Sequence, residues 1–359
     1  MKIKYFLEKN SNNFYYISLF IGLLSFSWLS TYDNVTPYIE SFDNVRMIVS
    51  SFFLLLRILS LFLIDKNYFI KSSIVTIPFL ISFYFCRSIY LLQSLAFVLA
   101  AYKVDKNKVL KIIVCSSIIT YLVSLIGILS NAVYVQFVKP PRFRCYFGFK
   151  HPSFFSMHFC AILFGLWYLH FKDNKTLSLI IFELSAAFLY FVPNTRTSAI
   201  ILALFPLTLL FSKFTLNSKN FTFELLVIYS PFILLIFSLI LTFIVKPAEP
   251  TSFLETFTIR FTQAHDYYLN GGIHFFKSSK LWLDNMYMFL LEYFGIVCSI
   301  VYMSLLAMLN KHLIKQKNYH FLAISLFFLV YALMDNYGLN IRFNISLLFL
   351  SDALIDLKI

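Results

Sequence analysis

Apolar runs near or above about 18 residues recur from one end of this chain to the other. A run of that length is enough for a helix to cross the roughly 30 Å hydrocarbon core of a bilayer. Hydrophobic residues fill 60% of the 359 positions and charged residues only 13%, whereas soluble globular domains are about 45–50% apolar. The sequence therefore predicts an all-α, polytopic integral membrane protein.

The apolar runs divide into twelve expected membrane spans. They cover residues 14–31, 45–64, 72–86, 88–102, 109–131, 153–170, 176–193, 198–212, 224–245, 286–308, 319–334 and 342–356. The third and fourth are separated only by Arg87, so they form either two spans or one long kinked helix. Three lysines precede the first run in the charge order of a signal sequence. No small-residue cleavage site closes that run, and we interpret it as an uncleaved first span.

Clusters of lysine fall in every second connection between these spans. The positive-inside rule places such clusters in the cytoplasm, and both chain ends with them. An eleven-span register would split the clusters between the two sides. Two long connections, about 132–152 and about 246–284, then lie outside the cytoplasm. We expect residues 1–359 to form a single membrane domain whose active-site face is made by these two loops.

The remaining composition excludes several classes of function. The formal net charge of +13 is spread over short connections, a pattern typical of topology signals and anionic-lipid contact rather than of nucleic-acid binding. The chain has no GxxxxGK[ST] or strand-linked GxGxxG motif, so its energy would come from a gradient or an activated substrate. Its five cysteines include no CxxC pair, which argues against a disulfide framework or a zinc site. We expect no metal and no cofactor.

The first long external loop is basic although it faces outward. It carries Arg142, Arg144, Lys150 and His151, and Pro152 then suits the first turn of the next helix. Guanidinium groups bind phosphate oxygens in a bidentate fork, so a polyanionic head group such as a lipid pyrophosphate would explain the charge. The alternative is an interfacial loop that contacts anionic lipids.

Two further arginines are expected on the outer side. Arg196 stands in the turn PNTRTS between two spans, and Arg342 adjoins the last external turn. A simple external turn needs no arginine, which makes Arg196 a candidate phosphate ligand. The alternative is an ordinary charge that reaches the interface along its aliphatic stem.

The second long loop carries Arg260 and His265 on a stretch, Thr251–Tyr268, whose apolar residues predict a helix along the membrane surface. Gly271 and Gly272 are expected to end it.

Asp284 and Asn285 open the tenth span, with Tyr287 one helical turn on. An aspartate there is either an N-cap, worth about 1 kcal/mol, or a catalytic carboxylate, and the two roles are compatible. No neighbouring aspartate accompanies it in the sequence, so a metal site is not expected.

Three charged residues fall inside expected spans, where charges are costly and are functional candidates. They are Arg57, Glu183 and Glu292. Arg57 is within reach of the cytoplasmic end. Either glutamate is a possible partner for Arg57 or a proton carrier in a transporter.

Three segments together resemble the O-antigen polymerase and ligase family of bacterial surface-polysaccharide assembly. They are RCYFGFKHPSFF from Arg144, NTRTSAIILAL from Asn194 and LDNMYMFLLEYFGIVCSIVYM from Leu283. The first is similar to the family's Arg, Gly, His/Asn-Pro pattern before a span. The second is similar to its Ser/Thr-Arg-Thr/Ser turn, and the third to its His/Asp-Asn-x-Tyr segment. The resemblance covers roughly residues 135–310, and the N-terminal third adds only the number of spans.

The resemblance implies a GT-C-like membrane glycosyltransferase in the bacterial cytoplasmic membrane. Such enzymes take undecaprenyl-pyrophosphate-linked glycans as donor and acceptor, and arginines do work that a divalent cation does elsewhere. A polymerase joins repeat units for a capsule, an exopolysaccharide or an O-antigen, and a ligase moves the finished chain to another acceptor. Asp284 stands where ligases often have His, which favours a polymerase. A chain-length regulator and a flippase are possible partners.

These considerations give a candidate set of site residues. The expected general bases are Asp284, His265 and His151, in that order, and Lys150, Asn285 and Tyr287 are expected to position the substrate. The expected pyrophosphate ligands are Arg142, Arg144, Arg196, Arg260 and Arg342. A lipid-linked oligosaccharide flippase or other transporter is the alternative from a different class, and a ligase is the alternative within the family.

Overall fold

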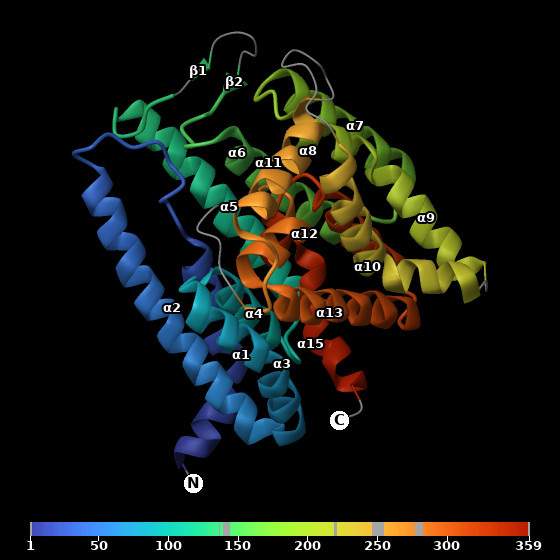
Figure 1. Cartoon of the computed structure of the whole chain (residues 1–359). Helices are drawn as coiled ribbons and strands as arrows, with labels where there is room; N and C mark the ends of the chain where they lie inside the picture. Colours follow the sequence, from blue (N-terminus) through green and yellow to red (C-terminus); the bar gives the residue numbers. More distant parts are fainter. Residues whose placement is uncertain are drawn as a thin grey trace. The chain divides into compact units, whose positions relative to one another are not determined.

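The computed structural model describes residues 2–135, 137–138, 144–218, 221–245, 255–276 and 283–357. The described residues are helical except for connecting turns and one two-stranded sheet, so the predicted all-α class is confirmed. The chain folds into two compact units (Figure 1). Unit 1 comprises Met1–Lys66 and Ala100–Leu204, and unit 2 comprises Asn67–Leu99 and Phe205–Ile359.

Unit 1 is built around a long pair of adjacent helices. Its elements are α1 (Lys2–Leu23), α2 (Thr36–Ile64), α5 (Lys106–Leu129), β1 (Phe137–Val138), β2 (Arg144–Cys145), α6 (Pro152–Leu166), the π-helical turn η1 (Trp167–Phe171), α7 (Lys175–Phe191) and α8 (Arg196–Ala203). Helices α1 and α2 lie side by side (Figure 1). Their backbones approach closely at two serines, because Ser18 Oγ donates to Ser50 O (2.7 Å) and Ser50 Oγ donates to Ser18 O (2.8 Å). Small residues with shared hydrogen bonds are typical of helix pairs in membranes.

Arg57 of α2 is buried in unit 1, with 1% of its surface exposed. Its Nε donates to Ala100 O (3.0 Å), and its Nη1 and Nη2 donate to Ser11, to Asn12 Oδ1 (3.1 Å) and to Tyr102 O. The oxygens of Ala100 and Tyr102 lie at and just beyond the end of α4, where helix carbonyls have no partner of their own. Arg57 is therefore a structural cation.

Unit 2 contains most of the C-terminal half. Apart from boundary residues, its elements are α3 (Lys66–Cys86), α4 (Tyr90–Ala100), α9 (Phe205–Asn217), α10 (Phe221–Ile244), α11 (Glu255–Gly271), α12 (Met286–Phe289), the π-helical turn η2 (Leu290–Phe294), α13 (Ile296–Lys315), α14 (Tyr319–Tyr331), η3 (Tyr337–Leu339), η4 (Ile345–Phe349), α15 (Leu350–Ala353) and η5 (Leu354–Asp356).

A buried amide joins three helices of unit 2. Pro231 interrupts α10 and has no N–H to donate to Val227 O, four residues earlier. Asn310 of α13, which is fully buried, donates to that oxygen instead (2.9 Å). Its own Oδ1 accepts a hydrogen bond from Ser325 of α14 (2.7 Å). The hydrogen bond that the proline removes is thus replaced by one from a side chain that joins α10, α13 and α14.

The tenth and the twelfth expected spans differ from the structure. The tenth, 286–308, is broken at Gly295, whose φ of 87° belongs to the left-handed region. The twelfth, 342–356, consists of short 3₁₀ and α-helical turns rather than one helix. The third and fourth are two separate helices, because Arg87 (φ 54°) ends α3.

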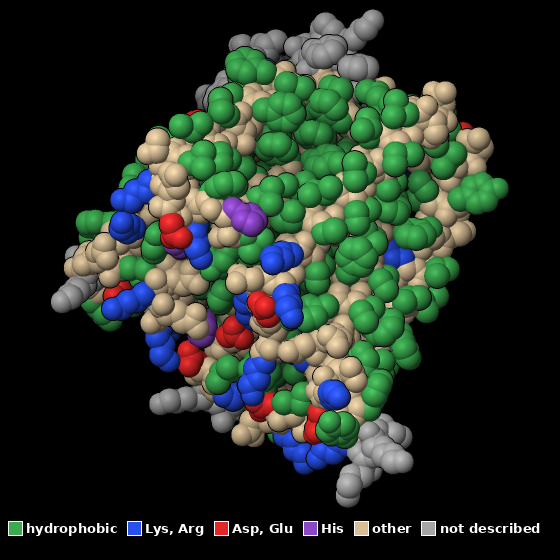
Figure 2. Space-filling view, turned by 180° about the vertical axis from the view of Figure 1, so that it is seen from behind, with side chains coloured by type: hydrophobic (Ala, Val, Ile, Leu, Met, Phe, Trp, Pro, Cys, Tyr) green, Lys and Arg blue, Asp and Glu red, His purple; other side chains and the backbone are tan. Residues whose placement is uncertain are grey.

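Seven of the described helices are long and apolar enough to cross a membrane. In the most apolar 18-residue stretch of α3 only 17% is buried inside the protein, and in that of α10 only 22%. Figure 2 shows hydrophobic side chains covering broad areas of the surface with no charge among them. Exposed apolar surface of this extent has to be covered by another apolar phase. The architecture is that of a multi-pass membrane protein.

Candidate functional site

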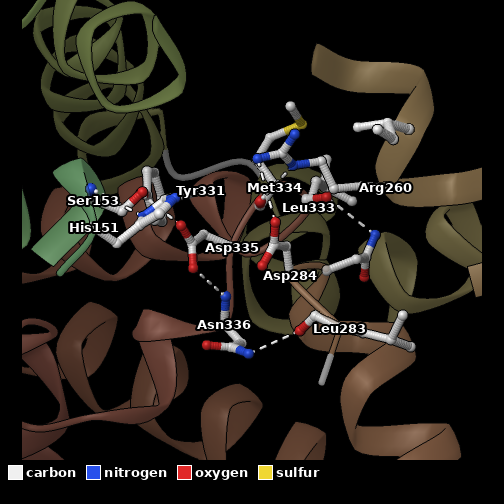
Figure 3. Close-up of polar contacts among 12 residues, drawn as sticks. His151, Ser153, Arg260, Leu283, Asp284, Tyr331, Leu333, Met334, Asp335 and Asn336 are labelled. Atoms are coloured by element: carbon white, nitrogen blue, oxygen red, sulfur yellow. Dashed lines mark hydrogen bonds and ion pairs between the residues drawn. The ribbon is translucent and has the colours of Figure 1, made fainter. Parts of the chain in front are cut away.

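The start of α12 and the turn after α14 are joined by hydrogen bonds around Asp284 (Figure 3). Asn285 Nδ2 donates to Leu333 O (3.0 Å), Asn336 Nδ2 donates to Leu283 O (2.8 Å), and Met286 N donates to Ala332 O (2.8 Å). These bonds hold the carboxylate of Asp284 at a fixed place beside the turn.

Arg260 of α11 contacts both parts of this cluster (Figure 3). Its Nε donates to Met334 O (3.1 Å), and its Nη2 lies 3.4 Å from Asp284 Oδ2. The Arg260 side chain is 18% exposed and that of Asp284 46% exposed. Asp284 is therefore an accessible carboxyl group with a fixed cation beside it, and accessibility is what a general base requires.

Asp335 lies in the same turn but in a different environment. It is buried, and it accepts hydrogen bonds from Tyr331 Oη (3.2 Å) and from the backbone N of Asn336 (2.8 Å). Burial, and after it the charge of Asp284, raises the pKa of Asp335 well above its ordinary value. An exposed and a buried carboxyl group in one cluster have different environments, and such pairs recur in acid–base chemistry.

Sequence reasoning did not include Asp335 in the site. The available signal was its position, since Asp284 and Asp335 each stand at the end of an expected span on the same predicted side. Among the residues described, no group of three or more His, Cys, Asp and Glu is arranged to hold a metal ion.

Asp335→Asn is expected to change the pH dependence of stability. A carboxyl group with a raised folded-state pKa stabilises the protein below its ordinary pKa of about 4, and this contribution is lost as pH rises toward the folded-state value. The melting temperature of the variant minus that of the wild type should therefore increase as pH is raised above about 4. Melting curves in one detergent across pH 4–8 measure this difference, and a difference that stays constant would contradict the role assigned to burial.

Asn285 and Tyr287, expected to position the substrate, are fully buried. Asn285 is the N-cap of α12, since its Oδ1 accepts from Met288 N (3.1 Å), and Tyr287 Oη donates to Leu329 O (2.8 Å). Both side chains thus bond within the protein and stabilise the helix start. Asp284 precedes the cap residue, so it does not have the capping role considered from the sequence.

His265 and Arg342 are not part of this cluster. His265 Nδ1 lies 3.1 Å from Thr242 O, and its ring packs on Phe243 of α10. Because each residue turns a helix by about 100°, His265 and Arg260 point about 140° apart around α11. α11 packs against α10. Arg342 is 3% exposed, and its backbone N donates to Asn340 Oδ1 (2.9 Å).

The remaining candidate residues belong to unit 1. Arg144 is in β2, paired with Val138 of β1, and Lys150 is exposed. His151 is the N-cap of α6, and its Nδ1 accepts from Ser153 N (3.3 Å), as drawn in Figure 3. Arg142 lies outside the described residues.

Arg196 is the first residue of α8, close to the start of α6. Ser156, in the first turns of α6, is hydrogen-bonded to Thr195, the N-cap of α8, with an Oγ–Oγ1 distance of 2.7 Å. Among the described residues, Arg196 has no ion-pair partner, and its buried Nε has no hydrogen-bond acceptor. Helix N-termini carry a partial positive charge, so this corner of unit 1 combines a guanidinium group with the N-terminus of a helix.

The two glutamates that fall inside expected spans differ in exposure. Glu183 of α7 is exposed. Glu292 of η2 is only 3% exposed, and neither of its carboxyl oxygens has a hydrogen-bond partner among the described residues.

No protein-family model, curated protein or solved structure matches this chain.

Proposed function

We propose that this chain is a membrane glycosyltransferase that polymerises undecaprenyl-pyrophosphate-linked oligosaccharide repeat units. The reaction would take place on the outer face of a bacterial cytoplasmic membrane and serve a capsule, an exopolysaccharide or an O-antigen. In this proposal the chain crosses the membrane twelve times, with both ends in the cytoplasm. The basic loop before α6, the turn before α8 and the cluster at the start of α12 are then external.

The observation that carries the proposal is the uncompensated positive charge at Arg196. A buried guanidinium N–H without an acceptor is costly, and a phosphate oxygen supplies both the acceptor and the missing negative charge. The N-termini of α6 and α8 favour the same ligand. A lipid pyrophosphate fits the chemistry of this corner and the apolar surface around it.

Asp284 and Arg260 support a second part of the proposed reaction, the activation of the acceptor hydroxyl. Asp284 would take the proton from the acceptor hydroxyl while the hydroxyl oxygen attacks the anomeric carbon of the donor sugar. The bond from that carbon to the pyrophosphate oxygen breaks, and the electron pair leaves with the lipid pyrophosphate. Arginines stabilise the charge that develops on the leaving group. The proposal requires no metal ion.

Reconstitution tests the function directly. Purified protein in liposomes would receive lipid-pyrophosphate-linked repeat units, without nucleotide and with a chelator present. A product ladder spaced by one repeat unit is the expected result. Absence of a ladder, with glycan transferred to a different acceptor, would indicate a ligase instead.

A flippase is the second candidate, and Glu292 is the observation that favours it. Buried ionisable groups in membrane proteins often mark ion or substrate pathways. In the same liposomes, repeat units that change leaflet without being joined would establish transport and overturn the polymerase proposal.

Arg196→Ala is expected to reduce the initial rate of ladder formation by about 10²–10³-fold, the effect of losing one oxyanion donor, roughly 2.7–4 kcal/mol. Arg196→Lys should recover part of the rate, because a point charge replaces the fork. Lys111→Ala, at an exposed position of α5, is the control and should keep the wild-type rate. A near-normal rate for Arg196→Ala at equal protein level would remove Arg196 from the site.

A further inference from the structure

Glu292 lies just before a break in a helix, which ends at Gly295 and restarts as α13. The segment η2 is a π-helical turn, a form that occurs mostly as single turns at functional sites. Gly295 follows with φ 87° and ψ 170°, and the helix restarts as α13. A Cβ at position 295 would collide with the backbone oxygen of Phe275. The break is thus required by the packing and tolerates only glycine.

Neighbouring elements satisfy the backbone groups that the break exposes. Ser82 Oγ of α3 donates to Phe294 O (3.1 Å), and Cys86 Sγ donates to Tyr293 O (3.0 Å). On the other side, Ile296 N donates to His274 O (2.9 Å). The turn around Glu292 is therefore fully supported along its backbone, while the carboxyl group that it carries has no partner among the described residues.

Among the described residues, no cation lies within ion-pair distance of the Glu292 carboxyl group. The titratable groups on the elements around the turn include Tyr267 on α11, Cys86 on α3, Tyr287 on α12 and Cys298 on α13, which are neutral in their ordinary state, and the exposed cation Arg87, which follows Cys86. Tyr267 is close enough for the charge of Glu292 to contribute, after burial, to a raised pKa of the phenol. The exposed His274 touches the turn through its backbone oxygen.

An ionised carboxylate buried without a partner is strongly disfavoured, and such a group takes up a proton instead. We propose that Glu292 is a proton-binding site: it holds a neutral carboxylic acid while η2 is closed around it, and releases the proton to water when the turn opens. Because only the open turn can hydrate the carboxylate, proton binding and turn geometry are linked. This proposal does not depend on the polymerase assignment.

Infrared difference spectroscopy of the full-length protein at pH 7 tests the protonation state. The spectrum of the wild type should contain a carboxylic-acid C=O band that is missing from the spectrum of Glu292→Gln. Loss of carboxylate bands for Glu292→Gln would overturn the proposal. Glu292→Asp, which keeps a carboxyl group, should shift the acid band rather than remove it and serves if the Gln variant does not fold.

Amide hydrogen exchange tests the link to the turn. After correction for the intrinsic effect of pH, residues 290–297 of the wild type should lose protection as pH rises, whereas Glu292→Gln should keep it. Equal profiles for the two proteins would show that the proton does not control the turn. Both measurements need no substrate, so their outcome stands apart from that of the polymerisation assay.

Discussion

Asp284→Asn is expected to abolish polymer formation in reconstituted liposomes while the protein folds normally. Asn keeps the shape of the side chain but cannot accept the proton of the acceptor hydroxyl, and a positioned general base typically contributes about 10²–10⁴-fold to a rate. The ion pair between Asp284 and Arg260, which the substitution removes, is partly exposed, and such pairs contribute only about 0–1 kcal/mol to stability. The initial rate of ladder formation and the melting temperature, measured on the same preparation, separate the two effects.

The matched control is Asp266→Asn, an exposed carboxylate of α11 in the same unit. It should leave the rate unchanged. A wild-type rate for Asp284→Asn would exclude Asp284 as the base. Asp335→Asn in the same assay then shows whether the buried carboxyl of the cluster takes part in the reaction.

Arg57→Met is expected to cause the largest loss of stability in unit 1. Methionine has a similar length but no donors, so Ala100 O, Tyr102 O and Asn12 Oδ1 would lose the guanidinium hydrogen bonds. Each buried acceptor left without a donor costs about 1–3 kcal/mol. The total is comparable with the roughly 5–15 kcal/mol by which most proteins are stable. A much lower melting temperature, or loss of the monodisperse protein from detergent extracts, is the expected result.

Lys66→Met is the control for this variant, because Lys66 is an exposed cation just after α2. It should melt like the wild type. Arg57→Lys should fall between the two, since one ammonium cannot reach all the acceptors of a guanidinium. An unchanged melting temperature for Arg57→Met would show that these hydrogen bonds contribute no net stability.

Arg57 also shows why a residue's role was harder to predict than its element. The apolar run and its helix follow from the sequence, because hydrophobic residues at this density leave few other structures in a membrane. Two of the partners of Arg57 are the backbone oxygens of Ala100 and Tyr102. Every residue has a backbone oxygen and no sequence pattern marks it, so these partners could not be predicted from the sequence.

The tenth expected span illustrates the same limit. Residues 286–308 are mostly apolar, with Glu292, Gly295, Ser299 and Ser304 as the exceptions, and a lone glycine is compatible with a continuous helix. Whether the helix continues depends on what packs against position 295. The backbone oxygen of Phe275 occupies the space of a Cβ there, and that contact joins segments distant in the sequence.

The sequence by itself determined the class of this protein: helical, apolar over most of its surface and crossing a membrane several times. It also marked Arg196, Arg260 and Asp284 as unusual charges at the ends of apolar runs. Only the tertiary structure decided which charges meet: Asp284 with Arg260 beside the buried Asp335, and Arg57 with backbone carbonyls. The physical reason is that these properties depend on interactions over different distances along the chain. Hydropathy and helix periodicity are local properties of the chain, whereas the ionisation of a carboxyl group depends on burial and on charges that folding brings near it.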